Sequence, residues 1–540
     1  CGSFLQTFAS ALGYSAEEFA RLGLFAERPA ELGSRCTVFM NSAVKQAQKD
    51  GAGVENIAAG LSVSVVKNAL YKVIRAPSPD ALGRNIVVQG GTFYNDSVLR
   101  AFELETGREV IRPSLAGLMG AYGAALYAKQ NAETLSGVLK KEELEKFTHE
   151  VKAIVCGGCQ NACRITVNTF DGGRKFIGGN RCDKPVTSVK KDENLNLYAV
   201  IRKKLAGYGD VPGKITVGLP LVLNMYELLP FWHTFFKELG FGVKVSPFST
   251  RKLYFSGQNS IPSDTVCYPA KLSHGHIEYL AAQNVDAVFY PCMTYNFDEK
   301  LGDNHYNCPV VAYYPEVLKA NVPSLNGDVK FIYDYVGLHR PRNFGGKIYK
   351  ILKKYFPSAG ISRRCVRKAA KKSYAEYYRY MEFLRAEGRR ITDTAVKNKI
   401  PVVILAGRPY HVDPEINHGI DELAVNLGTA VITEDAVSGF QSRFPTNVLN
   451  QWTYHARLYA AAKYSLNMPY ADLIQLVSFG CGLDAVTSDE TRAILENGNK
   501  LYTQIKIDEI TNLGAVKIRL RSLFEAHNER RRASDEEKQP

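Results

Sequence analysis

Apolar runs of strand length alternate with amphipathic, helix-like segments along most of the chain, and this alternation restricts the fold more than any other feature. Residues 215–220 and 401–407 have the pattern of buried strands, and 226–239 has helical periodicity. Strands that alternate with helices form parallel sheets. We therefore predict an α/β fold with two parallel-sheet subdomains, at 211–330 and 395–525. Further strands are predicted at 243–246, 287–292, 310–313, 430–433 and 473–477.

The other segments have different patterns. Residues 1–130 combine short strands, at 85–89 and 110–111, with helices at 95–102 and 117–125. The rest of the chain is predicted to hold a charged helical linker at 131–150, a cysteine-rich module at 151–190, a long basic helical connector at 340–394 and a frayed tail at 527–540.

The net charge of +14 is concentrated in one segment. Residues 340–390 hold sixteen Lys and Arg against three Glu, and so carry thirteen of the fourteen charges. Basicity this local says little about the partners of the whole molecule. Hydrophobic residues make up 45% of the chain, which is typical of a globular protein, and no run of about 20 apolar residues predicts a membrane span. The chain begins with Cys1 rather than Met, which predicts a fragment of a longer protein.

The eleven cysteines favour thiolate metal binding in a reducing cytoplasm. They are odd in number, and the chain is long enough to fold without disulfides. The densest group is Cys156, Cys159 and Cys163, and a predicted hairpin brings Cys182 back beside them. Four thiolates at this spacing bind Zn²⁺ or a [4Fe–4S] cluster, and the spacing does not choose between the two.

A second set of cysteines is dispersed: Cys267, Cys292, Cys308 and Cys481. Cys292 and Cys481 follow predicted strands, where parallel sheets bind their ligands, whereas Cys308 precedes one. The alternative is that all four are small buried apolar side chains, the commonest role of an isolated cysteine.

Several other features are weaker. His274 and His276 have a poor spacing for a helical metal pair, so we expect them to face solvent or to bond locally. The pair Gly90–Gly91 after a strand is a weak nucleotide signal, because many loops contain paired glycines. Cys365 lies among arginines, which would lower its pKa, although a surface thiol is the simpler interpretation.

A polar group follows the predicted strand at 401–407. It consists of Arg408, Tyr410, His411, Asp413 and Glu415. The end of a parallel strand is a good position for a polar ligand site. A charged loop without a ligand explains the pattern almost as well.

Three phrases in the first part of the chain resemble the ATP-dependent activases of 2-hydroxyacyl-CoA dehydratases and benzoyl-CoA reductases. They are the opening Cys-Gly-Ser-Phe-Leu, residues 32–40, and Val-Gln-Gly-Gly-Thr-Phe-Tyr-Asn at 88–95. The resemblance implies the C-terminal part of an actin-like ATPase domain, and a [4Fe–4S] cluster bridging a homodimer with Cys36 as one ligand. It also implies that Gly90, Gly91 and Gly120 line the adenosine side of an ATP pocket. Because the N-terminal lobe of that fold would lie upstream, this chain alone is expected to lack ATPase activity.

Residues 150–525 resemble activase-related proteins, and their later part is similar to the cluster-bearing subunits of 2-hydroxyglutaryl-CoA dehydratase. The phrases at 262–271 and 406–414 carry this resemblance. It implies that the cysteines at 267, 292, 308 and 481 hold a [4Fe–4S] cluster.

These observations lead to one main hypothesis and two alternatives. The main hypothesis is an iron–sulfur protein that couples ATP hydrolysis, in the complete protein, to low-potential electron transfer toward a dehydratase partner. The first alternative is a non-catalytic scaffold that docks an activase to a dehydratase. The second is a zinc-ribbon nucleic-acid-binding protein, which fits less well because the sequence has no base-reading motif.

Overall fold

The computed structural model describes residues 2–33, 37–74, 76, 78–131, 138–157, 163–180, 193–263, 265–478, 480–509 and 513–536. The chain divides into two compact units, Cys1–Glu145 and Lys146–Pro540, which are described separately. Within the described ranges, the helices are all too short or too polar to cross a membrane.

The first unit contains a small parallel sheet packed among helices. Strands β1 (Ile86–Val87) and β2 (Val110–Ile111) are joined by α5 (Asp96–Thr106), which confirms both predicted strands and the helix between them. Asn95 caps α5 by accepting a hydrogen bond from the Val98 N–H. The other helices are α1 (Gly2–Ala11), α2 (Ala16–Leu24), α3 (Thr37–Lys49), α4 (Val54–Lys67) and α6 (Met119–Gln130).

An antiparallel sheet opens the second unit. Its strands are β3 (His149–Val155), β4 (Arg164–Phe170) and β5 (Lys175–Gly178), in that order. The β4–β5 hairpin confirms the one predicted after Cys163. The predicted helical linker is wrong at its end, because α7 covers only Lys141–Leu144. The β-branched residues that follow pair with β4 instead, Ile154 opposite Ile165.

Two four-stranded parallel sheets form the rest of the second unit, which confirms the predicted α/β fold. The first has the order β7-β6-β8-β9 and the second β11-β10-β12-β13. The strands of the first are β6 (Thr216–Leu219), β7 (Gly242–Val245), β8 (Ala287–Phe289) and β9 (Lys330–Ile332). The strands of the second are β10 (Val402–Ala406), β11 (Ala430–Ile432), β12 (Ala471–Ser478) and β13 (Thr503–Ile507).

The predicted strand at 310–313 is wrong. These residues belong to helix α12 (Pro309–Asn321), in which Pro309 occupies the first turn and Cys308 is the N-cap. Proline is favoured at that position because the first helical N–H groups need no partner. The apolar run has the pattern of a strand although it lies in a helix, where Val311 and Ala312 are buried, and the fourth strand of the sheet is β9.

Helices connect the strands of both sheets or flank them. Those of the first sheet are α9 (Met225–Glu238), α10 (Arg251–Gly257), α11 (Tyr268–Ala281) and α13 (Pro341–Tyr355), while α8 (Leu197–Ala206) precedes this sheet and contacts β11 of the second. Those of the second are α15 (Pro414–Asn417), α16 (Ile420–Asn426), α17 (Glu434–Val437), α18 (Thr453–Leu466), α19 (Gly482–Asn497) and α20 (Leu513–Glu536).

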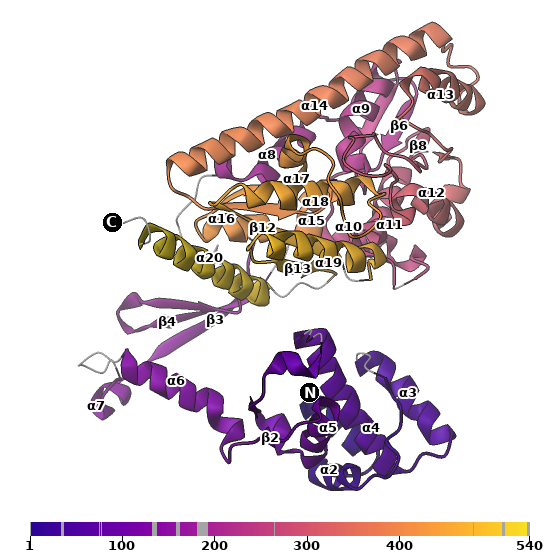
Figure 1. Ribbon diagram of the computed structural model, residues 1–540. Coiled ribbons are helices and arrows are strands. Elements are labelled where there is room, and N and C mark those ends of the chain that lie inside the picture. The colour runs from indigo at the N-terminus through magenta and orange to yellow at the C-terminus, as the bar shows by residue number, and fades with distance from the viewer. Residues whose placement is uncertain are drawn as a thin grey trace. The chain divides into compact units, whose positions relative to one another are not determined.

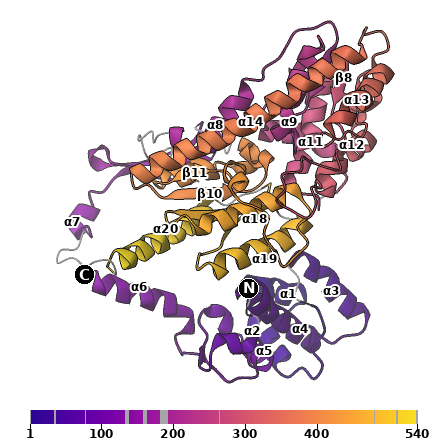
Figure 2. The same ribbon diagram turned by 45° about the horizontal axis from the view of Figure 1, so that its top comes forward.

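The longest helix is α14 (Arg363–Lys397), which packs against α9 beside one sheet and against α17 and β11 beside the other (Figures 1 and 2). It confirms the long basic helix, although 341–355 forms the separate helix α13. Buried side chains of both sheets, such as Phe289 and Ile404, share one hydrophobic core. The two sheets are therefore held together by a common core as well as by α14.

The predicted frayed tail from residue 527 is wrong at its beginning. His527 lies in α20 and is buried, and its Nδ1 is 2.6 Å from Asp472 Oδ2. This contact joins α20 to β12.

Candidate metal centre

Each parallel sheet has a point at which the strand order reverses. The chain leaves β6 for β7 on one side and continues in β8 on the other, and β10 is related to β11 and β12 in the same way. Loops at the carboxyl ends of such strands diverge and leave a crevice that binds ligands. Residues after β8, β10 and β12 are therefore well placed for chemistry.

Three of the dispersed cysteines occupy the same local position, the N-cap of a helix. Cys267 precedes α11, Cys308 precedes α12 and Cys481 precedes α19. At Cys308 the Val311 N–H donates to Sγ at 3.4 Å. Free N–H groups and the helix dipole favour negative charge at such positions, so each helix favours a thiolate.

The three thiols interact electrostatically with one another. Burial raises the pKa of Cys267 to about 12, and the neighbouring Cys308 and Cys481 raise it as well. Burial also raises the pKa of Cys308 and of Cys481, while Arg408 lowers both. Without a bound cation the thiols are therefore protonated at neutral pH, and metal binding would have to displace their protons.

Arg408 is the cation of this group. It follows β10, and its guanidinium lies 3.7 Å from Cys481 Sγ and 3.2 Å from His455 Nε2. It also forms a buried ion pair with Asp484, whose second oxygen accepts the Ser478 N–H at 2.9 Å. The ion pair thus joins the loop after β10 to the first turn of α19, and the bond to Ser478 joins that turn to the end of β12.

The polar group predicted after β10 divides between the site and the interior. The buried Tyr410 is close enough to Arg408 and the three cysteines to interact with them electrostatically. Asp413 accepts hydrogen bonds from Tyr226 and from the Ser249 N–H, and Glu415 accepts one from Tyr268. These carboxylates serve internal bonding, so Arg408 and Tyr410 are the members that reach the cysteines.

Cys292 and Cys365 have other surroundings. Burial raises the pKa of Cys292 to about 12, and its charged neighbours are Glu316 and Asp334 rather than the other cysteines. Cys365 is exposed near the start of α14. Across the described ranges, His, Cys, Asp and Glu side chains do not gather in threes or more in a geometry that could hold a metal ion.

The cysteine-rich module is described in part. Cys156 follows β3 and Cys163 precedes β4, and the Cys156 N–H donates to the Cys163 carbonyl at 2.8 Å. This bond brings the backbone of two predicted ligands together. Cys159, Cys182 and Cys36 lie outside the described residues.

Gly90, Gly91 and Gly120 lie near the carboxyl ends of β1 and β2. The Gly90 N–H donates to the Ala116 carbonyl at 2.8 Å, so the loops after the two strands are adjacent. A Cβ added at any of the three glycines would meet no atom within 4 Å. The backbone is therefore accessible there, as close approach of a ligand requires.

Some features of the site were not predicted from the sequence. No sequence pattern around His455 indicates that it lies beside Arg408, because its helix is distant in sequence from both Arg408 and Cys481. Asp484, three residues after Cys481, could have been recognised as an acidic residue in a first helical turn. His274 and His276 are buried in α11, which contradicts the solvent-facing alternative. They bond locally, His274 with Ser260 and Tyr314, and His276 with Ser246 and Ser249.

Two family models match the chain, and they confirm the resemblance to dehydratase activases. Residues 1–128 match the BadF/BadG/BcrA/BcrD ATPase family. Residues 216–437 match the CoA enzyme activase uncharacterised domain (DUF2229). The chain thus joins an ATPase-type segment to an activase-type segment.

Individual relatives match the first segment. The 2-hydroxyisocaproyl-CoA dehydratase activator of Clostridioides difficile is 33% identical over 132 residues, which are 24% of this chain and 48% of that protein. The (R)-2-hydroxyglutaryl-CoA dehydratase activating ATPase of Acidaminococcus fermentans is 33% identical over 131 residues, or 24% and 49%. The chain therefore spans about half the length of these relatives.

A solved structure covers a similar region. It is the activator of the 2-hydroxyisocaproyl-CoA dehydratase from Clostridium difficile with bound ADPNP, at 31% identity and a TM-score of 0.22. The alignment covers 26% of this chain and 52% of that one.

Proposed function

We propose that this chain is an iron–sulfur component of a 2-hydroxyacyl-CoA dehydratase-activating system, which passes low-potential electrons toward a dehydratase. The observation that carries the proposal is that Cys267, Cys308 and Cys481 each cap a helix and interact electrostatically with one another, with Arg408 beside Cys481. The similar proteins, which are activators of 2-hydroxyacyl-CoA dehydratases, support the same system.

The donor set fits an iron–sulfur cluster by its chemistry. Thiolates are the ligands that such clusters use, and Cys267, Cys308 and Cys481 interact electrostatically with one another. Because the described side chains do not form a metal-holding geometry, binding would require the three sulfurs to move closer together. A cluster supplies one-electron transfer when it is bound. Cys292 is the fourth ligand implied by the family resemblance, and its different surroundings make it the member to test separately.

The chain's own residues would tune this centre. Helix N–H groups and the Arg408 guanidinium would stabilise negative charge on the cysteine sulfurs, which would raise the reduction potential of a bound cluster. Burial would exclude water from that cluster. Asp484 holds Arg408 in place beside Cys481. These residues position and stabilise the thiolates.

In the complete protein, the ATPase-type segment would couple ATP hydrolysis to electron transfer. We propose that Gly90, Gly91 and Gly120 approach the adenosine side of bound ATP, and that Cys36 contributes to a [4Fe–4S] cluster shared in a homodimer. The module with Cys156, Cys159, Cys163 and Cys182 is proposed as a second metal site, for zinc or for iron.

Metal analysis of the full chain purified without oxygen tests the proposal. We expect iron and acid-labile sulfide, with a loss of iron in the variants Cys267→Ser, Cys308→Ser and Cys481→Ser. Serine is a favourable N-cap, so these variants keep the helix starts while removing the sulfur. Cys365→Ser is the matched control and should retain its iron. Colourless protein that contains zinc alone would refute the electron-transfer function.

The variant Cys292→Ser tests whether Cys292 is the fourth ligand of the proposed cluster. Loss of iron comparable to that of Cys481→Ser would include Cys292 in the ligand set. Unchanged iron would leave the three N-cap cysteines as the protein ligands. A scaffold without redox function would keep its effect on a dehydratase partner in all four variants.

A further inference from the structure

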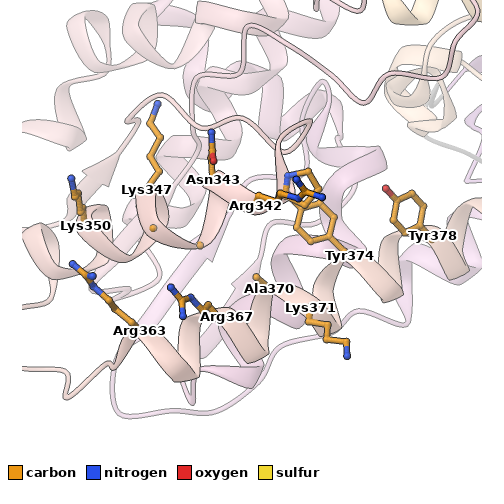
Figure 3. Close-up of a pocket in the computed structure, with 13 residues that line it drawn as sticks. Arg342, Asn343, Lys347, Lys350, Arg363, Arg367, Ala370, Lys371, Tyr374 and Tyr378 are labelled. Carbon is orange, nitrogen blue, oxygen red and sulfur yellow. The ribbon is translucent and has the colours of Figure 1, made fainter.

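A basic groove lies between α13 and α14, at the end of α14 near the first sheet (Figure 3). Its volume is about 1060 Å³. Six cationic side chains line it, and no acidic side chain does: Arg342, Lys347, Lys350, Arg363, Arg367 and Lys371.

The positions of these residues follow from helical periodicity. Arg363, Arg367 and Lys371 are spaced four apart on α14, so they form one stripe along that helix. Lys347 and Lys350 are three apart on α13 and also line the groove. Gly346 lies between the two stripes and borders open space, because a Cβ added there would meet no atom within 4 Å.

The cations of the groove have no acidic partner among the described residues. Two other lysines of these helices do have acidic partners, Lys354 with Asp334 at 3.3 Å and Lys372 with Glu238 at 2.6 Å. The Arg363 guanidinium instead lies 5.3 Å from the centre of the Tyr349 ring, which holds it in place. Six unpaired like charges around one cavity repel each other, and a bound polyanion would relieve this repulsion.

One end of the groove is aromatic. Figure 3 shows Tyr374 and Tyr378 at this end, opposite Lys350 and Arg363. The Tyr374 hydroxyl donates to the Leu338 carbonyl at 2.8 Å and is thereby fixed. Tyr378 is 52% exposed and offers a ring on which a planar group can stack.

We propose that this groove binds a small polyphosphorylated nucleotide, with its phosphates over the cations and its base against Tyr378. Arginine guanidinium groups match phosphate geometry through paired hydrogen bonds. The volume is at the upper end of the range for small-molecule sites, which favours a compact ligand over a nucleic-acid strand that tracks along a surface. The site is separate from the cysteine centre and does not depend on a metal.

Calorimetric titration of the full chain with ATP tests this assignment. We expect saturable binding that weakens about tenfold or more in Arg363→Gln/Arg367→Gln, because charged hydrogen bonds to phosphate are lost. Gly346→Glu should have a similar effect by filling the groove with a carboxylate. Arg364→Gln/Lys368→Gln is the matched control, since these exposed residues of α14 do not line the groove, and its affinity should be unchanged.

Two further ligands separate nucleotide from other polyanions. ATP should bind more tightly than inorganic tripolyphosphate, and Tyr378→Ala should remove that difference. Equal affinity of the two ligands for the unmodified chain would overturn the nucleotide assignment. So would ATP binding that is absent or insensitive to the groove variants, or a 20-nucleotide RNA that binds more tightly than ATP and loses affinity in the same variants.

Discussion

The ion pair between Arg408 and Asp484 is almost wholly inside the protein, with side-chain exposed fractions of 3% and 4%. Removing one partner of such a pair leaves the other charge buried without compensation. We expect Arg408→Met to lower the free energy of unfolding by about 3–5 kcal/mol in metal-free protein. The double variant Arg408→Met/Asp484→Asn should recover part of the loss. Urea unfolding followed by circular dichroism measures both, and a single variant as stable as the parent would contradict this view of the site.

His276 makes stability depend on pH. Burial lowers its pKa to about 3, whereas an unfolded histidine titrates near 6.5. As pH falls below 6.5 the unfolded chain binds a proton that the folded chain does not, so stability decreases until about pH 3. Between pH 7.5 and 5 this residue should cost about 2 kcal/mol.

The variant His276→Gln isolates this effect, because its amide can still bond with Ser246 and Ser249. Urea unfolding at both pH values should show a smaller loss of stability in His276→Gln than in the parent. Replacement of the exposed His149 by Gln is the control. Equal pH dependence in all three proteins would mean that His276 is not responsible.

At the scale of residues, the sequence predicted part of the site. Local pattern placed Cys481 and Arg408 after their strands, because a strand end is a local property. The electrostatic interaction of Cys267, Cys308 and Cys481 with one another and with Arg408 depends on how three helix starts pack, and the different charged neighbours of Cys292 depend on the same packing. Contacts between residues that are distant in sequence cannot be predicted from the pattern around each residue.

Two glycines in the interiors of neighbouring helices should respond in opposite ways to alanine. In α13, Gly346 has open space at its Cβ position, so Gly346→Ala should stabilise the protein by about 0.5–1 kcal/mol through reduced backbone entropy in the unfolded chain. In α14, a Cβ on Gly388 would lie 2.7 Å from Ala436 Cβ. Gly388→Ala should therefore destabilise by about 1–3 kcal/mol. Thermal and urea unfolding of both variants would show the difference in sign, and equal signs would contradict the packing of α14 on α17.

At the scale of elements, periodicity predicted most strands and the long helix, and it failed where an apolar run was ambiguous. Val310, Val311 and Tyr313 are β-branched or aromatic, as in a strand, but Cys308 and Pro309 before them start a helix. Pro309 was the available signal, since proline favours a first helical turn. Strand β9 has only three residues and depends on its pairing with β8.

At the scale of the whole molecule, the segment around α7 should be the first site of proteolysis. Glu142, Glu143 and Glu145 are exposed, and α7 has only four residues. Brief digestion with a Glu-specific protease should release a persistent fragment beginning near residue 146, identified by mass spectrometry. Early cleavage between residues 197 and 507 would instead show that the shared core is less stable than its burial indicates.

A helix that packs beside both sheets also has a mechanical consequence. Separating the sheets would remove α14 from α9 at one end or from α17 at the other, and would expose the core that they share. Large relative motion of the sheets therefore costs buried apolar contacts. This restricts how far Cys267 and Cys308, beside the first sheet, can move from Cys481, beside the second.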